Sequence, residues 1–110
     1  MEISFASRKL QRQLESAREI QRAHGKLAKA IMRRMAVLQA AACLADVPAS
    51  PPERRHLLKG NMAGCFAVSI SGNWRLVFRP AHDPLPSLPD GGPDLQRITA
   101  IEIVGILDYH

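Results

Sequence analysis

Hydrophobic residues recur at helical spacing in the first half of the chain and alternate with polar residues in much of the second half. Residues 2–6 alternate apolar and polar side chains and predict a short strand. From Ser7, a suitable N-cap, the helical period predicts one helix up to Gly25 and a second from Lys26 to about Asp46. Glycine readily takes the left-handed conformation that ends a helix, so Gly25 is expected to join the two helices into a hairpin.

The second half of the chain predicts strands. A proline-rich segment, residues 48–52, ends the helical region, because proline lacks a backbone donor and disfavours helix before it. Period-two alternation then predicts one strand from Cys65 and another from Trp74, joined by a tight turn at residues 71–73. Trp74 is expected in the core with the other apolar residues of its strand.

The remaining segments complete a single domain. Residues 80–93 hold five prolines and two adjacent glycines, and therefore predict a long loop. From Gln96 a last strand runs to the terminus, and its two apolar faces predict a central position in the sheet. The order strand, helix, helix, strand, strand, strand predicts one α+β domain over residues 1–110. A twisted, mainly antiparallel sheet would carry the helical hairpin on one face.

The net charge of +5 is unevenly distributed along the 110 residues. Residues 1–60 hold 12 Lys and Arg against 5 acidic residues, whereas residues 61–110 hold 3 against 5. A basic half favours a polyanionic partner, either nucleic acid or an acidic protein segment. No apolar run is long enough for a membrane span and the first residues do not form a signal peptide, so a cytoplasmic location is expected. Cys43 and Cys65 lack metal-ligand spacing and are expected to be free packing residues.

Polar groups suited to acid–base chemistry or phosphate binding gather at three places. Cleaving RNA through the ribose 2′-hydroxyl needs a base, an acid and fixed cations that stabilise the charge on phosphorus. Histidine suits proton transfer, and the planar guanidinium of arginine matches phosphate oxygens. No metal is required, and no ligand-like spacing indicates one. The three places are His56 with Lys59, Arg75 with Arg79 on the same strand face, and the C-terminal Asp108, Tyr109 and His110.

Each of these signals also has a purely structural interpretation. A lone histidine such as His56 is more often a loop or capping residue. A strand arginine such as Arg75 is usually a half-exposed cross-strand partner, and a C-terminal Tyr-His pair can be a solvated tail. On the residues alone, the choice between a catalytic site and these structural roles stays open.

Several short motifs together resemble one known family. The chain contains, in order, HLLKG (56–60), GCFAVS (64–69), GNWRLVF (72–78) and a terminal DYH. This constellation resembles the plasmid-maintenance killer proteins, the HigB-type branch of the RelE/ParE toxin superfamily, whose relatives are sometimes labelled killer suppression proteins. The similarity covers residues 54–79 and the end of the chain, and the strand–helix–helix start agrees in pattern only.

The resemblance implies a RelE-like β-α-α-β-β-β fold and the toxin of a type II toxin–antitoxin pair. Such a toxin is an endoribonuclease that cuts mRNA on the ribosome without metal or cofactor, with RNA on the concave sheet face opposite the helices. The implied partners are a helix-turn-helix antitoxin, the ribosome and mRNA, with operator DNA bound only through the antitoxin complex and no membrane. The implied residues are His56, Arg75, Asp108, Tyr109 and His110 for catalysis, and Lys59 and Arg79 for phosphate binding.

The chain departs from the family pattern in two places. The aromatic pair common on the first hairpin strand is here Cys65-Phe66, so base stacking would depend on Tyr109 and on Phe66 or Trp74. The insertion at residues 80–93 can reshape one edge of the RNA face. Two alternatives stay open: a catalytically inactive RelE-fold module that binds an antitoxin and operator DNA, and a ParE-like gyrase inhibitor. The second is disfavoured, because that branch does not use this acid–base set.

Overall fold

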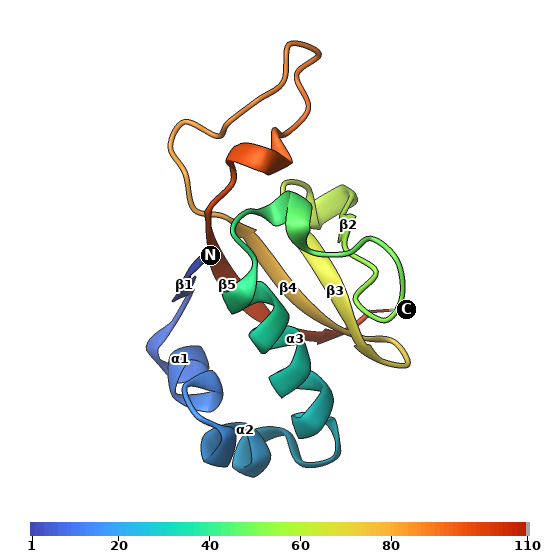
Figure 1. Cartoon of the computed structure of the whole chain (residues 1–110). Coiled ribbons are helices and arrows are strands. Elements are labelled where there is room, and N and C mark those ends of the chain that lie inside the picture. The colour runs from blue at the N-terminus through green and yellow to red at the C-terminus, as the bar shows by residue number, and fades with distance from the viewer. Residues whose placement is uncertain (110) are drawn as a thin grey trace.

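The computed structural model describes residues 1–109 and consists of one five-stranded sheet with helices packed on one face (Figure 1). The helices are α1 (Arg8–Leu14), α2 (Ala17–His24) and α3 (Ala28–Ala40), and the strands are β1 (Glu2–Phe5), β2 (His56–Leu57), β3 (Phe66–Ser71), β4 (Trp74–Pro80) and β5 (Ala100–Asp108). The strand order is β1-β5-β4-β3-β2. β1 runs parallel to β5, and the other neighbouring pairs are antiparallel. This confirms the predicted α+β fold, including the interior position of the last strand, whereas the short edge strand at His56–Leu57 was not predicted.

The helical region differs from the prediction at two points. The first predicted helix is divided into α1 and α2, because Ser16 takes an extended conformation with φ of −152° and starts a new helix. Its side chain accepts a hydrogen bond from the Glu19 backbone at 3.2 Å, as an N-cap does. Ser7 caps α1 as expected. The last helix ends at Ala40, and a separate 3₁₀ turn, Leu44–Asp46, follows it.

The main core lies between the helices and one face of the sheet. Ile31 and Leu38 of α3 are fully buried against alternate residues of β3, β4 and β5. The Phe66 and Phe78 rings stack there with their centroids 6.2 Å apart. The prediction that Trp74 belongs to this core is wrong, since 37% of it is exposed. It begins β4 at the tip of the β3–β4 hairpin, beyond the buried positions of that strand.

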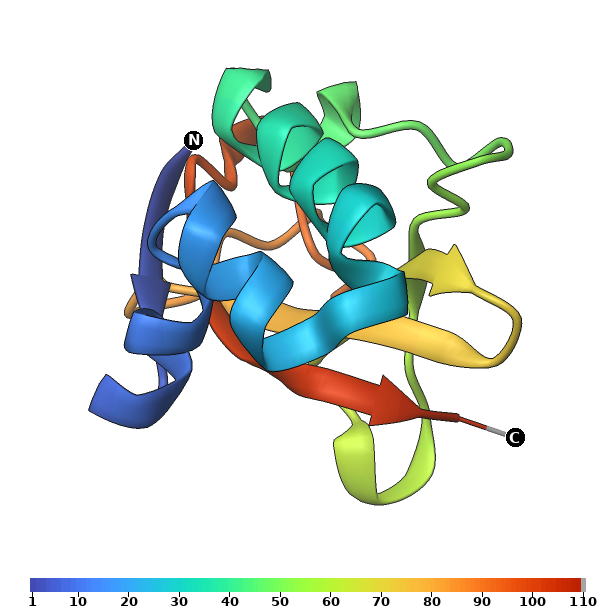
Figure 2. The same cartoon turned by 90° about the horizontal axis from the view of Figure 1, so that it is seen from below.

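The opposite side of the sheet, the open face, carries no α-helix from residues 1–109. Figure 2 shows the helices on one side of the sheet and the β2–β3 connection on the other. A small apolar cluster covers the middle of the open face and leaves its ends accessible. Its buried members are Leu58, Ala67 and Val77, and the partly buried residues packed on them are Met62, Cys65, Val104 and Leu107.

A long excursion between β4 and β5, residues 81–97, projects beyond the end of the sheet (Figure 1) and is called the arm below. It corresponds to the predicted loop. His82 anchors its base, because His82 Nε2 accepts hydrogen bonds from the backbone nitrogens of Thr99 at 3.0 Å and Ala100 at 3.2 Å. Both partners are N–H donors, so Nε2 is the unprotonated nitrogen of this ring.

Candidate active site

Strand pairing brings His56 and Arg75 to the open face. His56 pairs with Ala67 of β3, which pairs with Val77 of β4, so these three side chains form a row on one side of the sheet. Arg75 precedes Val77 by two residues on β4 and therefore shares that side. From usual strand dimensions, the backbones of His56 and Arg75 lie about 10 Å apart across the sheet and about 7 Å along it.

The chain itself orients the ring of His56, which is exposed on the edge strand β2. Nδ1 lies 2.8 Å from the carbonyl oxygen of Arg54. A carbonyl oxygen only accepts hydrogen bonds, so Nδ1 carries a proton and donates it. In the neutral ring Nε2 is then unprotonated, which is the form that a general base requires.

The Arg75 guanidinium is held at the β3–β4 turn. Its Nη1 donates to the carbonyl oxygens of Gly72 at 2.7 Å and Trp74 at 3.0 Å. The turn favours glycine at Gly72, where φ is +55°. From α3, Arg34 Nε donates to the carbonyl oxygen of Ser69 at 2.6 Å, and Ser69 is the residue paired with Arg75. These contacts fix the backbone and the guanidinium of Arg75 and leave its Nη2 for an anion.

The C-terminal residues are divided between the two sides of the sheet. Alternation along β5 turns Asp108, which is paired with Trp74, toward the side of the helices. Tyr109 continues the ladder, because its N–H donates to the carbonyl oxygen of Asn73 at 2.8 Å. Alternation returns Tyr109 to the open face, where it is 39% exposed. His110 lies outside the described residues. The register thus brings Tyr109, but not Asp108, to the side that carries the other candidates.

The two predicted phosphate contacts, Lys59 and Arg79, differ in their surroundings. Lys59 is exposed just after β2. Arg79 shares the face of Arg75, as predicted, but its Nε donates to Glu102 Oε1 at 2.6 Å and its Nη2 forms an ion pair with the same oxygen. Sequence reasoning missed Glu102. The available signal was its charge, since Glu102 is the one charged residue in the otherwise apolar run of residues 100–107.

Comparison with known proteins places this fold in a family. The family model for HigB-like toxins, RelE-like toxins of the type II toxin–antitoxin system HigB, matches residues 3–84. The chain belongs to the HigB-like toxins. The matched residues include His56, Lys59, Arg75 and Arg79, whereas β5 and the C-terminal candidates follow the matched segment. The resemblance predicted from short motifs is therefore confirmed at the level of the family.

Solved structures share the fold of this HigB-like toxin at low sequence identity. The YoeB/ParE toxin from Agrobacterium tumefaciens is 14% identical with a TM-score of 0.55, and the comparison covers 100% of both chains. The YoeB–YefM complex from Staphylococcus aureus is 19% identical with a TM-score of 0.51, covering 100% of this chain and 97% of that one. No curated protein matches the sequence significantly. At these identities the structural likeness establishes the fold.

Only some aromatic rings of this HigB-like toxin are accessible for stacking. Phe66 is 3% exposed and packs on the helix side, so the expectation that it stacks on a base is wrong. Trp74 and Tyr109 are 37% and 39% exposed, and both lie beside the β3–β4 turn. Strand pairing puts Trp74 on the helix side with Asp108, so Tyr109 is the accessible ring on the face of Arg75.

Residues 1–109 contain no group of three His, Cys, Asp or Glu side chains that could hold a metal ion. Cys43 and Cys65 are free thiols, as expected. None of the helices in this part of the chain is long and apolar enough to cross a membrane.

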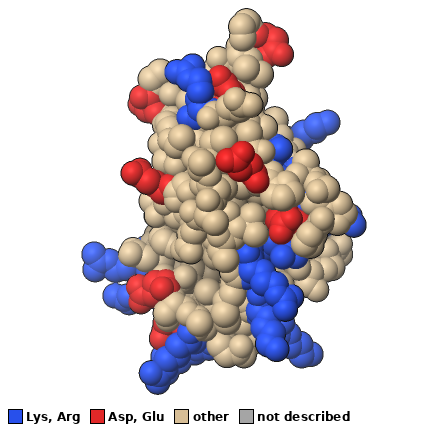
Figure 3. Space-filling model, in the orientation of Figure 1, with Lys and Arg blue, Asp and Glu red and all other residues tan. Residues whose placement is uncertain are grey.

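Basic side chains of the HigB-like toxin gather over its helices. In Figure 3, Lys and Arg cover the lower part of the molecule over α2 and α3, and most Asp and Glu lie higher, toward the arm. This basic surface is on the opposite side of the sheet from the open face. Its exposed members on the helical segment are Arg8, Lys9, Arg12, Arg18, Arg22, Lys26, Lys29 and Arg33.

Proposed function

We propose that this HigB-like toxin is a ribosome-dependent, metal-independent endoribonuclease that cleaves mRNA by attack of a ribose 2′-hydroxyl on the adjacent phosphodiester. The proposal is carried by one observation: His56 and Arg75 come from different strands and lie on the same helix-free face of the sheet. A base and a fixed cation on one surface meet two of the three requirements of this reaction. Membership of a RelE-like toxin family supports the same chemistry.

In the proposed reaction, His56 Nε2 takes the proton of the 2′-hydroxyl, and the resulting oxygen nucleophile attacks phosphorus. Arg75 donates to the non-bridging oxygens as negative charge builds up on them, an interaction that is stronger in the transition state than in the ground state. The bond from phosphorus to the 5′-oxygen then breaks. That oxygen takes a proton from the C-terminal segment, in which Tyr109 shares the open face and His110 is the favoured acid. The products are a 2′,3′-cyclic phosphate and a 5′-hydroxyl.

Binding of the substrate uses charge and stacking on two surfaces. On the open face, Lys59 contacts a flanking phosphate and Tyr109 stacks on a base near the scissile group. Arg79, the other predicted phosphate contact, is held by Glu102. The basic surface over the helices docks on ribosomal RNA. Because phosphate contacts dominate such an association, it should weaken steeply as the salt concentration rises.

An antitoxin is the proposed protein partner. The family is one half of a type II toxin–antitoxin system, and the fold is shared with a chain of the YoeB–YefM complex. The partner would carry a helix-turn-helix domain, so that operator DNA is bound only through the complex. An acidic antitoxin segment suits the basic surface over the helices. The site of action is the cytoplasm, where translating ribosomes are found.

Induced expression in bacteria tests the proposal. The intact chain is expected to arrest growth, whereas His56→Ala and Arg75→Ala at equal protein levels are expected not to. Arg97→Ala removes an exposed arginine of the arm and serves as the matched control, with toxicity like that of the intact chain. Normal growth with the intact chain overturns the proposal. Equal toxicity of the His56 and Arg75 variants would instead indicate a poison that does not use this site.

A further inference from the structure

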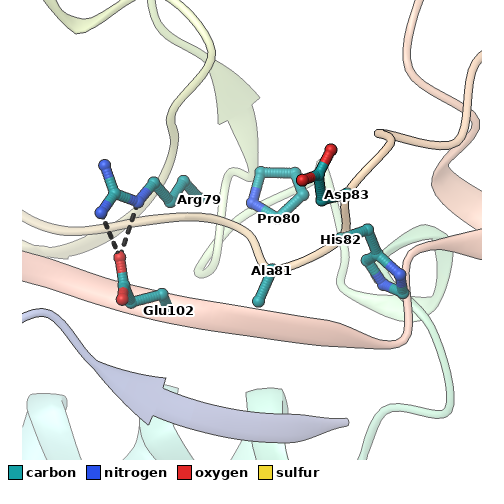
Figure 4. A pocket seen from close by; sticks show the side chains of 6 residues that line it. All are labelled: Arg79, Pro80, Ala81, His82, Asp83 and Glu102. Atoms are coloured by element: carbon teal, nitrogen blue, oxygen red, sulfur yellow. Dashed lines mark hydrogen bonds and ion pairs between the residues drawn. The ribbon is translucent and has the colours of Figure 1, made fainter.

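A shallow hollow lies on the open face where β4 continues into the arm, at the other end of the strand from the β3–β4 turn (Figure 4). Its volume is about 320 Å³, near the lower end of the ~300–1,000 Å³ typical of small-molecule sites. Figure 4 shows the Arg79–Glu102 pair at one end, His82 and Asp83 at the other, and Pro80 between them. The lining residues are Arg79, Pro80, Ala81, His82, Asp83 and Glu102.

The hollow presents hydrogen-bond acceptors. Arg79 directs both Nε and Nη2 at one oxygen of Glu102, Oε1. Two acceptors of the described residues then remain for a ligand, at opposite ends of the hollow: Glu102 Oε2 and the exposed carboxylate of Asp83. One cation and two carboxylates give the hollow a net negative charge. It is therefore a poor site for a phosphate and a suitable one for a flat, uncharged group that carries N–H donors.

The walls of the hollow are fixed before any ligand binds. Arg79 and Glu102 are directly paired residues of β4 and β5, so their ion pair joins the two strands across the open face. His82 is tied to the start of β5 by the two hydrogen bonds that its Nε2 accepts. Both ends of the hollow are thus attached to the sheet, which lowers the entropy that binding would otherwise cost.

We propose that this hollow binds one base of the mRNA and that it prefers guanine. The inference rests on the proposed function, because it requires mRNA on the open face. Arg75 and Arg79 lie on the same face of β4, four residues or about 13 Å apart. RNA with a phosphate at Arg75 can therefore place a neighbouring base in the hollow. Guanine presents adjacent N–H donors on its Watson–Crick edge, which carboxylate oxygens accept. The same edge of adenine, cytosine or uracil has a single donor group beside acceptors, which carboxylates repel.

Binding of uncleavable RNA tests this proposal. Short 2′-O-methyl oligouridines, with G, A or C in place of one central U, lack the hydroxyl that cleavage would use. By fluorescence anisotropy, the intact toxin is expected to bind the G-containing strand on the order of tenfold more tightly than the others. Glu102→Gln is expected to lose most of this preference and yet bind every strand more tightly, because Arg79 is released toward phosphates. Its plot of log affinity against log salt should steepen by about 0.7.

In Glu102→Gln the preference for G should fall while the affinity for RNA rises. A general loss of structure would instead lower both the preference and the affinity. Asp90→Asn is the matched control. It removes one negative charge from the arm outside the hollow, and the amide keeps the Oδ1 acceptor that Gly92 N contacts at 2.8 Å. The preference for G should survive this substitution.

Three results would overturn the inference: equal affinity of the intact toxin for all four strands, a preference for G that persists in Glu102→Gln, or no binding to RNA. Amide NMR signals of Ala81 and Glu102 should shift with the G-containing strand; shifts caused only by an antitoxin peptide would assign the hollow to a protein partner instead.

Failure of the proposed function would look different. A toxin that selects G in vitro without arresting growth would keep the base subsite and lose the nuclease assignment.

Discussion

Replacing Arg34 with methionine should destabilise the toxin, although the same change at the adjacent Arg33 should not. Arg34 is only 8% exposed and donates from Nε to the carbonyl oxygen of Ser69 at 2.6 Å. Arg33 is exposed on the same helix. Both substitutions remove one positive charge and keep an unbranched, flexible side chain. The comparison therefore isolates the buried contact beneath the strand that pairs with Arg75.

The expected size of the effect follows from the contact. A hydrogen bond from a charged group contributes roughly 1.5–3 kcal/mol, and its loss leaves a carbonyl oxygen of β3 without its side-chain donor. Part of this loss is offset, because burying a charge has its own cost that methionine avoids. We expect Arg34→Met to lower the free energy of unfolding by about 2 kcal/mol. For a domain of this size, that corresponds to a fall in Tm of about 8 °C.

Thermal denaturation followed by circular dichroism measures the difference. Arg33→Met should stay within about 0.5 kcal/mol of the intact chain, as expected for a surface substitution. Equal shifts in Tm for the two variants, in either direction, would refute the reasoning, because the effect would then come from net charge and not from the bond to Ser69.

Three further predictions follow from the fold and the site. Arg75→Lys should keep the positive charge but lose the planar guanidinium that the turn holds. Its cleavage rate in a translation reaction should fall at least about tenfold, compared with about 10²–10³-fold for Arg75→Ala. A lysine variant with full activity would contradict this. Phe78→Ala should lower the free energy of unfolding by about 3–5 kcal/mol in urea denaturation, since Phe78 is fully buried and stacked on Phe66; a loss below about 1 kcal/mol would contradict the packing. Burial lowers the pKa of His24 from its usual 6.5, so the unfolded chain binds a proton more readily than the folded one. Protonation of His24 therefore does not reduce the free energy of unfolding above pH 6.5, and reduces it progressively as the pH drops below 6.5. The Tm of His24→Gln should fall less on acidification than the Tm of the intact chain does.

The periodicity of the sequence predicted the layers of the fold better than the limits of its elements. Alternation identified β3, β4 and β5 because each strand buries one face against the helices. The break between α1 and α2 was missed, because the residues around Ser16 suit an exposed helix face as well as an N-cap. Trp74 was misplaced because alternation assigns a side of the sheet but does not say where the covering helices end.

The candidate site was predictable in composition and less so in geometry. Chemistry suited to RNA cleavage suggested His56 and Arg75, and the strand pairing that brings them to one face is not visible in either segment alone. Strand pairing also explains two features that the sequence did not predict. The β4–β5 register joins Arg79 to Glu102, and it turns Asp108 toward the helices. Register depends on contacts between distant strands, including a bulge between Val77 and Phe78, so local pattern could not supply it.

Primer extension on a translated message tests the central claim most directly. Messenger RNA from bacteria that express the intact toxin should show new 5′ ends within the reading frame. The same message with its start codon removed should stay uncut, as should message from cells that express His56→Ala or Arg75→Ala. Growth arrest with intact message, or cleavage that persists in both variants, would contradict the account.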